Sequence, residues 1–164
     1  MREYHLSKTD IERIMQRIRD GWPKDVGVSR PKALKIIEMD DGSIDDNSIL
    51  ICEEMILVVK DGIILPFLTM HILGSFPSIT VDMGAVRHVC NGADIMRPGI
   101  IRMDGFDKGS IVTVKDERHG KYIAVGVARV SSDEAIPMSK GVIVENKHYV
   151  GDRFWEECKR RALI

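Results

Sequence analysis

One stretch of nineteen residues decides the fold of this chain, because residues 82–100 read DMGAVRHVCNGADIMRPGI. Asp82 stands where a helix N-cap is expected, since its carboxylate can accept the free amide groups of a first helical turn. Apolar residues follow at spacings of three and four and give that helix one apolar side, at Ala85, Val86, Val89 and Cys90. Asn91 and Gly92 readily adopt the left-handed conformation that ends a helix, and Pro98 with Gly99 forms a turn. The stretch therefore predicts a short helix, a loop that contains glycine, and an abrupt turn.

This order of residues resembles the helix-and-glycine-loop signature of the PUA domain, an RNA-binding module found in pseudouridine synthases, archaeosine transglycosylases and translation factors. Residues 125–128 and 131–134 stand where PUA domains place a central strand and the turn after it. Residues 140–155 look like the closing segment of the malignant-T-cell-amplified protein family and its archaeal relatives, and residues 65–77 resemble that family's domain junction. The resemblance is specific over residues 65–155 and only architectural over residues 1–64.

The resemblance implies an α+β protein of two domains. Residues 1–77 would form a small α/β domain preceding the PUA domain, called pre-PUA in that family. Residues 78–164 would form a PUA pseudobarrel, mostly β with short helices, that ends in a C-terminal helix. The turn residues of the segment 74–78 agree with a boundary at this place. The family further implies RNA binding and a role in translation on the small ribosomal subunit.

The resemblance also names candidate RNA-binding residues on the helix and glycine loop. They are Arg87, His88, Asn91, Gly92, Ala93, Asp94, Met96, Arg97, Pro98 and Gly99, with Lys140 and Gly141 as additions. Glycine lets a phosphate or base approach the main chain, whose amide groups can then bind it. Arg87 and Arg97 would contact phosphates, which position RNA without reading its sequence. No aromatic residue lies between Gly84 and Ile100, so base stacking is not expected there.

Composition is compatible with this interpretation but does not demand it. The chain has 164 residues, of which 44% are hydrophobic, and a net charge of −1, so bulk charge would not attract RNA. Residues 1–77 hold 10 Lys/Arg and 13 Asp/Glu, whereas residues 78–164 hold 14 and 12. RNA would therefore bind a local patch of the second half.

Three features of the sequence concern the cellular location. The three cysteines are widely spaced, the chain start lacks an apolar signal core, and no apolar run approaches membrane-spanning length. We therefore expect a cytoplasmic protein with reduced thiols.

The remaining pattern predicts the other elements. A helix begins after Ser7, and its apolar face is Ile11, Ile14, Met15 and Ile18. Strands are expected around residues 32–39, 49–52, 56–60 and 63–65, and a short helix over 66–73. In the second half strands are expected near residues 79–81, 100–103, 111–114, 122–130 and 142–144, with a helix over 152–162. Gly126 suggests a bulge, and the acidic clusters at 40–43 and 45–47 suggest turns rather than a calcium loop.

Three hypotheses about function remain open. The first is a non-enzymatic RNA-binding protein in translation that grips tRNA or ribosomal RNA, alone or with a translation-factor partner. The others are an accessory RNA-binding subunit of an RNA-modification enzyme and a protein–protein adaptor. The sequence shows no nucleophile–base motif, metal-ligand spacing or cofactor loop, so we expect no catalysis, metal or cofactor. His148 and Asp152 have the spacing of an acid–base pair but lack a nucleophile motif nearby, and we expect a structural hydrogen bond.

Overall fold

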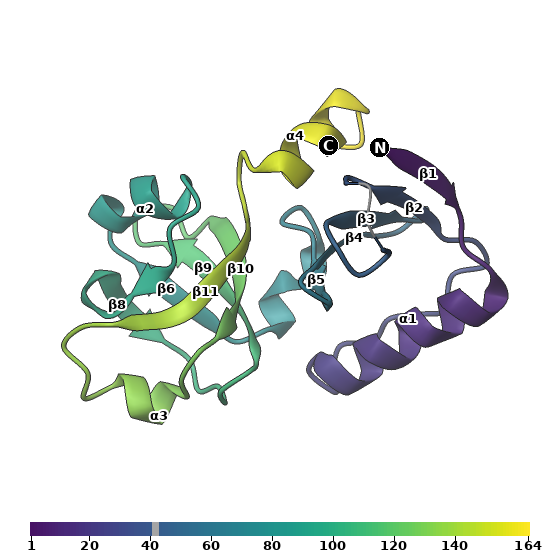
Figure 1. Cartoon of the computed structure of the whole chain (residues 1–164). Coiled ribbons are helices and arrows are strands. Elements are labelled where there is room, and N and C mark those ends of the chain that lie inside the picture. Colours follow the sequence, from purple (N-terminus) through teal and green to yellow (C-terminus); the bar gives the residue numbers. More distant parts are fainter. Residues whose placement is uncertain (41–42) are drawn as a thin grey trace.

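The computed structural model describes residues 1–40 and 43–164 (Figure 1). The first half contains β1 (Arg2–His5), α1 (Lys8–Gly21), β2 (Lys35–Glu38), β3 (Ser48–Ile51), β4 (Ile56–Lys60), β5 (Ile63–Pro66) and the 3₁₀-helix η1 (His71–Ser75). The second half contains β6 (Ser78–Val81), α2 (Met83–Val89), β7 (Ile95–Met96), the 3₁₀-helix η2 (Arg97–Gly99), β8 (Ile100–Met103), β9 (Ile111–Asp116), β10 (Tyr122–Ala128), α3 (Ser132–Ala135), β11 (Val142–Tyr149) and α4 (Arg153–Arg160). Two residues of the turn expected at 40–43 lie outside the described residues.

The first half is a five-stranded antiparallel sheet in the order β1-β2-β3-β4-β5, with α1 beside it. Ser7 caps α1 by accepting a hydrogen bond from the amide of Asp10 at 3.1 Å, and the four predicted apolar residues of the helix are buried. Strand β1 was not expected, because it is short and polar and pairs with β2, which lies 30 residues further along the chain.

The short helix expected over residues 66–73 is wrong. Strand β5 extends to Pro66, and helical structure begins only at His71, as the 3₁₀-helix η1. Between them Phe67 and Leu68 are both buried, and the Leu68 amide donates a hydrogen bond to His148 Nε2 at 3.3 Å. The Phe67 amide donates to Ile56 O at 3.2 Å and so continues the pairing of β5 with β4, which overrides the apolar spacing.

The second half is a six-stranded mixed sheet. Its strand order is β7-β11-β10-β9-β6-β8, and β6 runs parallel to β9 while the other pairs are antiparallel. Figure 1 shows α2 and α3 at opposite ends of this sheet. The bulge expected at Gly126 is confirmed, since the register between β10 and β11 shifts between Val125 and Gly126.

The two halves meet along β11 and α4. Lys147 pairs with Asp61 at 2.8 Å, and Arg153 pairs with Asp40 through two hydrogen bonds of 2.7 and 3.0 Å. The predicted hydrogen bond of His148 is confirmed: its Nδ1 lies 2.7 Å from Asp152 Oδ2. One buried apolar cluster includes residues of both halves, so the second half packs directly on the first.

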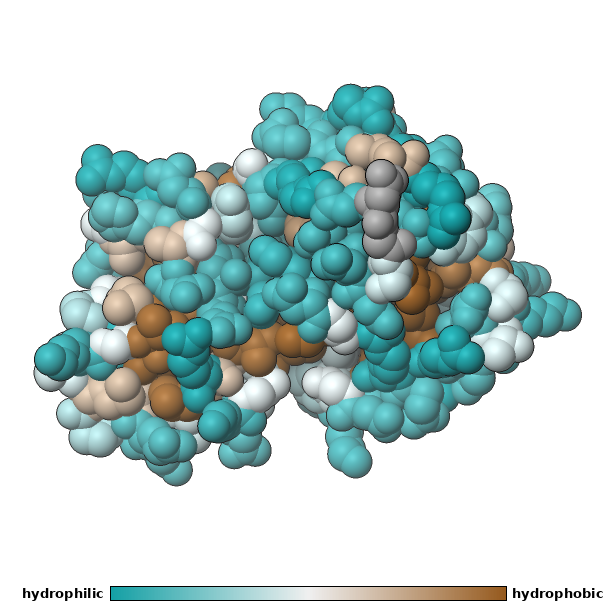
Figure 2. All heavy atoms as spheres, viewed as in Figure 1, coloured by the Kyte–Doolittle hydropathy of each residue, from teal (hydrophilic) through white to brown (hydrophobic). Residues whose placement is uncertain are grey.

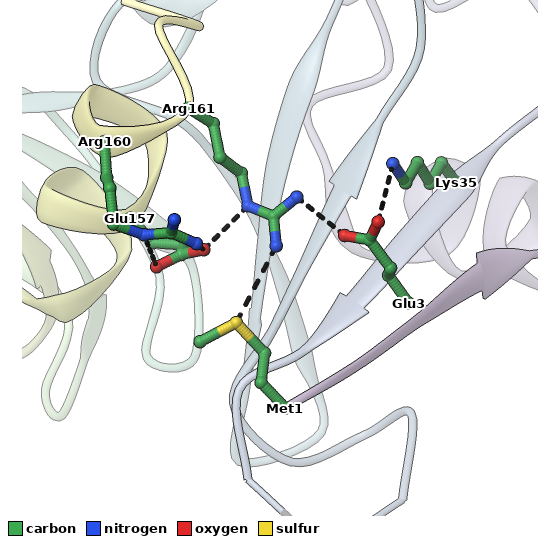
Figure 3. Close-up of polar contacts among 6 residues, drawn as sticks. All are labelled: Met1, Glu3, Lys35, Glu157, Arg160 and Arg161. Carbon is green, nitrogen blue, oxygen red and sulfur yellow. Dashed lines mark hydrogen bonds and ion pairs between the residues drawn. The ribbon is translucent and has the colours of Figure 1, made fainter.

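Helix α4 brings the end of the chain to β1, and Figure 1 shows the two termini close together. Figure 3 shows Arg161 lying between the carboxylates of Glu157 and Glu3. Its guanidinium lies 2.7 Å from Glu157 Oε1 and 2.6 Å from Glu3 Oε2. Glu157 is 7% exposed and also accepts hydrogen bonds from Arg160. The hydrogen bond from Arg160 and then that from Arg161 outweigh burial and lower the pKa of Glu157 to about 2.

This lowered pKa predicts a stability loss in acid. A carboxyl group whose pKa is lower in the folded state stabilises the fold above its unfolded pKa, and the contribution disappears as the pH falls from about 4.5 to about 2. The Arg160 side chain is 64% exposed, so solvent screens the interaction and we expect about 1 kcal/mol. Urea unfolding of Glu157→Gln should show this deficit at pH 7 and none at pH 2. Glu156→Gln, at an exposed neighbouring position, is the control; an equal deficit in both variants would contradict the prediction.

Candidate nucleic-acid interface

Helix α2 and the turn at Pro98–Gly99 are held together by Asp82 and Gly99. Asp82 Oδ1 accepts the Ala85 amide at 2.8 Å, which confirms the predicted N-cap, and the Asp82 amide donates to Gly99 O at 2.9 Å. A Cβ added at Gly99 would lie 2.9 Å from the Ala85 Cβ. A side chain at position 99 would therefore push the turn away from the helix.

The glycine loop between α2 and β7 is fastened to β11 by Asn146. The Asn146 side-chain amide donates to the carbonyls of Val89 and Ala93, both at 3.0 Å, and its main-chain amide donates to Asp94 Oδ1 at 3.0 Å. Gly92 has a φ of +94°, and a Cβ there would lie 3.1 Å from the hydroxyl of Tyr149. The loop is therefore fixed in shape before any ligand arrives.

The main-chain amides of this loop are already in use. The amides of Asn91 and Ala93 donate to His88 O, and the amide of Gly92 donates to Val89 O, at 3.0 to 3.1 Å. We expected these amides to bind a phosphate. For these three residues the expectation is wrong, because their amides already donate to carbonyl groups at the C-terminal end of α2.

A groove of about 410 Å³ lies between α2, the glycine loop and the Pro98–Gly99 turn. Six of the predicted site residues line it, namely His88, Ala93, Asp94, Met96, Pro98 and Gly99. Most of the other lining residues are apolar or glycine: Val81, Gly84, Ala85, Val89 and Ile95, together with Asp82. The groove thus combines apolar walls with two carboxylates, a chemistry that suits a flat group carrying hydrogen-bond donors better than a phosphate.

The surface around the groove is uneven in polarity. Met96 is 46% exposed at the groove and Ile136 is 61% exposed on the nearby α3 side. Figure 2 shows, for the face in view, apolar side chains gathered in separate patches within a mostly hydrophilic surface.

The six other predicted residues do not line the groove. Arg87, Asn91 and Lys140 are exposed, while Gly92, Arg97 and Gly141 are partly buried. Arg97 is occupied: its guanidinium donates to Ala135 O at 2.8 Å and to Ile136 O at 3.3 Å, and its main-chain amide donates to Gly141 O at 2.9 Å. Arg97 therefore joins η2 to α3 and to the segment before β11. Arg87 remains as the exposed cation of α2.

This engagement predicts that Arg97 acts mainly in folding. In Arg97→Lys a point charge replaces a fork of donors, and we expect the free energy of unfolding to fall by about 1 to 3 kcal/mol. Arg87→Lys, at an exposed position of α2, should change it by less than about 0.5 kcal/mol. Urea unfolding of both variants measures the difference. Full stability of Arg97→Lys together with lost RNA binding would instead favour a direct phosphate contact.

The sequence did not identify Asn146 or Tyr149 as residues that shape the site. Asn146 is buried and lies on β11, 52 residues after the Asp94 that it contacts. An asparagine at an otherwise inward-facing strand position was the available signal, since a buried amide must find partners. Its Oδ1 has no hydrogen-bond partner among the described residues.

Residues 1–40 and 43–164 contain no group of three or more His, Cys, Asp or Glu side chains placed to hold a metal ion. No helix within these same residues has the length and apolar character needed to cross a membrane.

The mixed pseudobarrel, with a capped helix and glycine loop beside a groove, defines a PUA-domain protein, and the model of the PUA domain family matches residues 77–150. An uncharacterized protein of Methanocaldococcus jannaschii is 35% identical over 159 residues, which cover 94% of this chain and 95% of that protein. The chain belongs to the PUA-domain family and is related to the malignant T-cell-amplified and translation machinery-associated 20 proteins.

Two of these eukaryotic relatives match over a shorter part. Translation machinery-associated protein 20 of Schizosaccharomyces pombe is 33% identical over 103 residues, and the malignant T-cell-amplified sequence 1 homolog of Drosophila melanogaster is 32% identical over 105 residues. These matches cover 58% and 59% of this chain and 57% of each relative. The crystal structure of a hypothetical protein from Pyrococcus horikoshii has the same fold, with a TM-score of 0.77 and 24% identity over 95% of this chain and 99% of that one.

Proposed function

We propose that this protein is a non-enzymatic RNA-binding protein that acts in translation, on tRNA or on the RNA of the small ribosomal subunit. The observation that carries the proposal is the groove beside α2, formed by the stretch of sequence that resembles the PUA signature. The names of the eukaryotic relatives, which associate one of them with the translation machinery, support the cellular setting. A cytoplasmic location, and a division into domains at residues 77 and 78, belong to the same proposal.

The lining of the groove favours an unpaired nucleotide over a duplex. One oxygen of Asp82 accepts the Ala85 amide and one oxygen of Asp94 accepts the Asn146 amide, while the second oxygen of each carboxylate accepts no hydrogen bond within the described residues. Such oxygens can accept from a base amino group or a ribose hydroxyl. His88 can add a further polar contact at the groove, and exposed Arg87 on the same helix can contact a phosphate.

The test is filter binding of purified protein to total tRNA and, separately, to small ribosomal subunits over a range of salt concentrations. We expect binding that weakens with salt, and a loss of about tenfold in affinity in Arg87→Glu, because a phosphate contact becomes a repulsion. Arg13→Glu, at an exposed position of α1, is the matched control for charge reversal. Failure of the wild-type protein to bind either RNA at low salt would overturn the proposal and move the search to protein partners.

A further inference from the structure

A cluster of basic side chains lies on the hairpin that joins β9 to β10, outside the groove and outside the residues named from the sequence. We call Lys115, Arg118, His119 and Lys121 the hairpin cluster. Arg118, His119 and Lys121 are exposed, and Lys115 is partly buried. The ion pairs found within residues 1–40 and 43–164 include none of these four side chains.

Asp116 fixes the shape of this hairpin. Asp116 is 5% exposed, and its carboxylate accepts hydrogen bonds from the amides of His119 at 2.5 Å and Lys121 at 3.1 Å. These amide donors, that of His119 first, lower the pKa of Asp116 because they stabilise its carboxylate. The Lys115 ammonium lies 5.7 Å from the centre of the Tyr122 ring, within the range of a cation–π contact. The Asp116 carboxylate therefore bonds to main-chain amides of the turn, and the basic side chains remain available for a ligand.

The hairpin cluster adjoins the beginning of α2. Glu117 donates its amide to Val81 O at 3.0 Å, and its Oε1 accepts the Met83 amide at 3.1 Å. Helix α2 has seven residues and so spans about 10 Å, with Arg87 and the glycine loop at its far end. A single strand of RNA that enters the groove needs only a short path along α2 to reach the hairpin cluster.

The chain segment that lies against the base of the hairpin contains no acidic residue. The Tyr122 hydroxyl lies 3.7 Å from the position of a Cβ added at Gly74 in η1, so the base of the hairpin touches the segment between the two sheets. Residues 62–81 contain no Asp or Glu. A phosphate beside the hairpin cluster therefore meets no repulsion from that segment.

The groove has no Lys or Arg in its lining that could neutralise an RNA phosphate. Its lining has two carboxylates and no Lys or Arg, and Arg97 is occupied by main-chain carbonyls. Every nucleotide brings one negative charge, and protein–RNA affinity depends strongly on neutralising these charges. We propose that the hairpin cluster is a second RNA contact, which binds backbone phosphates of the same strand whose unpaired nucleotide occupies the groove. This inference rests on the proposed function and adds the path of the strand to it.

The experiment compares the salt dependence of RNA binding in Arg118→Gln/Lys121→Gln with that of the wild type, using total tRNA. Each lost contact with a single strand should lower the slope of log affinity against log salt by about 0.7, so the double variant should lose about 1.4. Lys108→Gln is the matched control, because Lys108 is exposed in the turn at the opposite end of β9. Urea unfolding of each variant confirms that it is folded.

Each outcome decides the proposal. A lower slope in the double variant and an unchanged slope in Lys108→Gln would support it. An unchanged double variant, or an equal change in the control, would overturn it while leaving the groove proposal intact. If the double variant lost binding to small ribosomal subunits but kept its full affinity for naked tRNA and for small-subunit RNA freed of protein, the hairpin cluster would bind a ribosomal protein instead, and the RNA assignment would fall. Failure of the wild type to bind RNA would remove both proposals together.

Discussion

Gly126→Ala is expected to lower the free energy of unfolding by at least about 3 kcal/mol. A Cβ at this position would lie 2.1 Å from the carbonyl oxygen of Glu145 and 2.6 Å from Val144 Cγ1. The carbonyl belongs to the neighbouring strand, so no rotamer change relieves the contact and the β10–β11 pairing must open. Urea unfolding measures the loss.

The matched control for this substitution is Gly105→Ala, since no atom lies within 4 Å of a Cβ built there. We expect its stability to stay within about 0.5 kcal/mol of the wild type. A Gly126→Ala protein as stable as Gly105→Ala would show that β11 moves aside at low cost.

Gly126 lies opposite the part of β11 that contacts both the glycine loop and the first half of the chain. The register shift beside it pairs Val125 with His148 and Gly126 with Asn146, so Lys147 is the extra residue of a bulge. The bulge lies between Asn146, which holds the glycine loop, and His148, which holds the first half of the chain. A change at Gly126 should therefore disturb the groove and the contact between the halves together.

His148→Ala should cost about 3 to 5 kcal/mol. The imidazole is fully buried, with Nε2 accepting the Leu68 amide and Nδ1 within 2.7 Å of Asp152. Since the Leu68 amide is a donor, Nε2 carries the lone pair, and the proton on Nδ1 is donated to Asp152. Alanine leaves a buried carboxylate short of a partner, an amide without an acceptor, and a void beside Phe67, whose ring centre is 4.7 Å from the imidazole.

Thermal unfolding and limited proteolysis both report on this substitution. Proteolysis of His148→Ala should become faster in the segment around Leu68, because the hydrogen bond between the two halves is lost. His119→Ala, at an exposed histidine of the second half, is the control and should leave both measurements unchanged. Equal stability of the two variants would mean that the contact between the halves does not depend on His148.

The sequence predicted the elements that depend on neighbouring residues. The cap at Asp82, the apolar face of α1 and the bulge at Gly126 were predicted correctly, because side-chain spacing and glycine act within a few residues. The missing β1 and the wrong helix at 66–73 both involve long-range partners. Strand β1 pairs with β2, and the Leu68 amide bonds to a residue 80 positions away.

The candidate site shows the same division. The sequence predicted the helix, loop and turn between Asp82 and Gly99 but not the groove that they line, and it suggested free loop amides and a free Arg97. The amides close the end of α2 instead, and Arg97 reaches carbonyls 38 and 39 residues away. A sequence pattern identifies a side chain or amide as a possible hydrogen-bond donor. Only the folded chain shows whether that donor already has an acceptor within the protein.

The sequence alone indicated the α+β class through local periodicity and capping, and the family through an ordered signature. The tertiary structure decided which cations remain available and how the two halves are joined. Arg87, Arg118 and Lys121 are exposed, while Arg97 donates to carbonyls of α3 and its C-cap, and His148 accepts the Leu68 amide from the first half. Hydrogen bonds and the burial of charged groups depend on which atoms are close in space. The order of residues along the chain does not specify these distances.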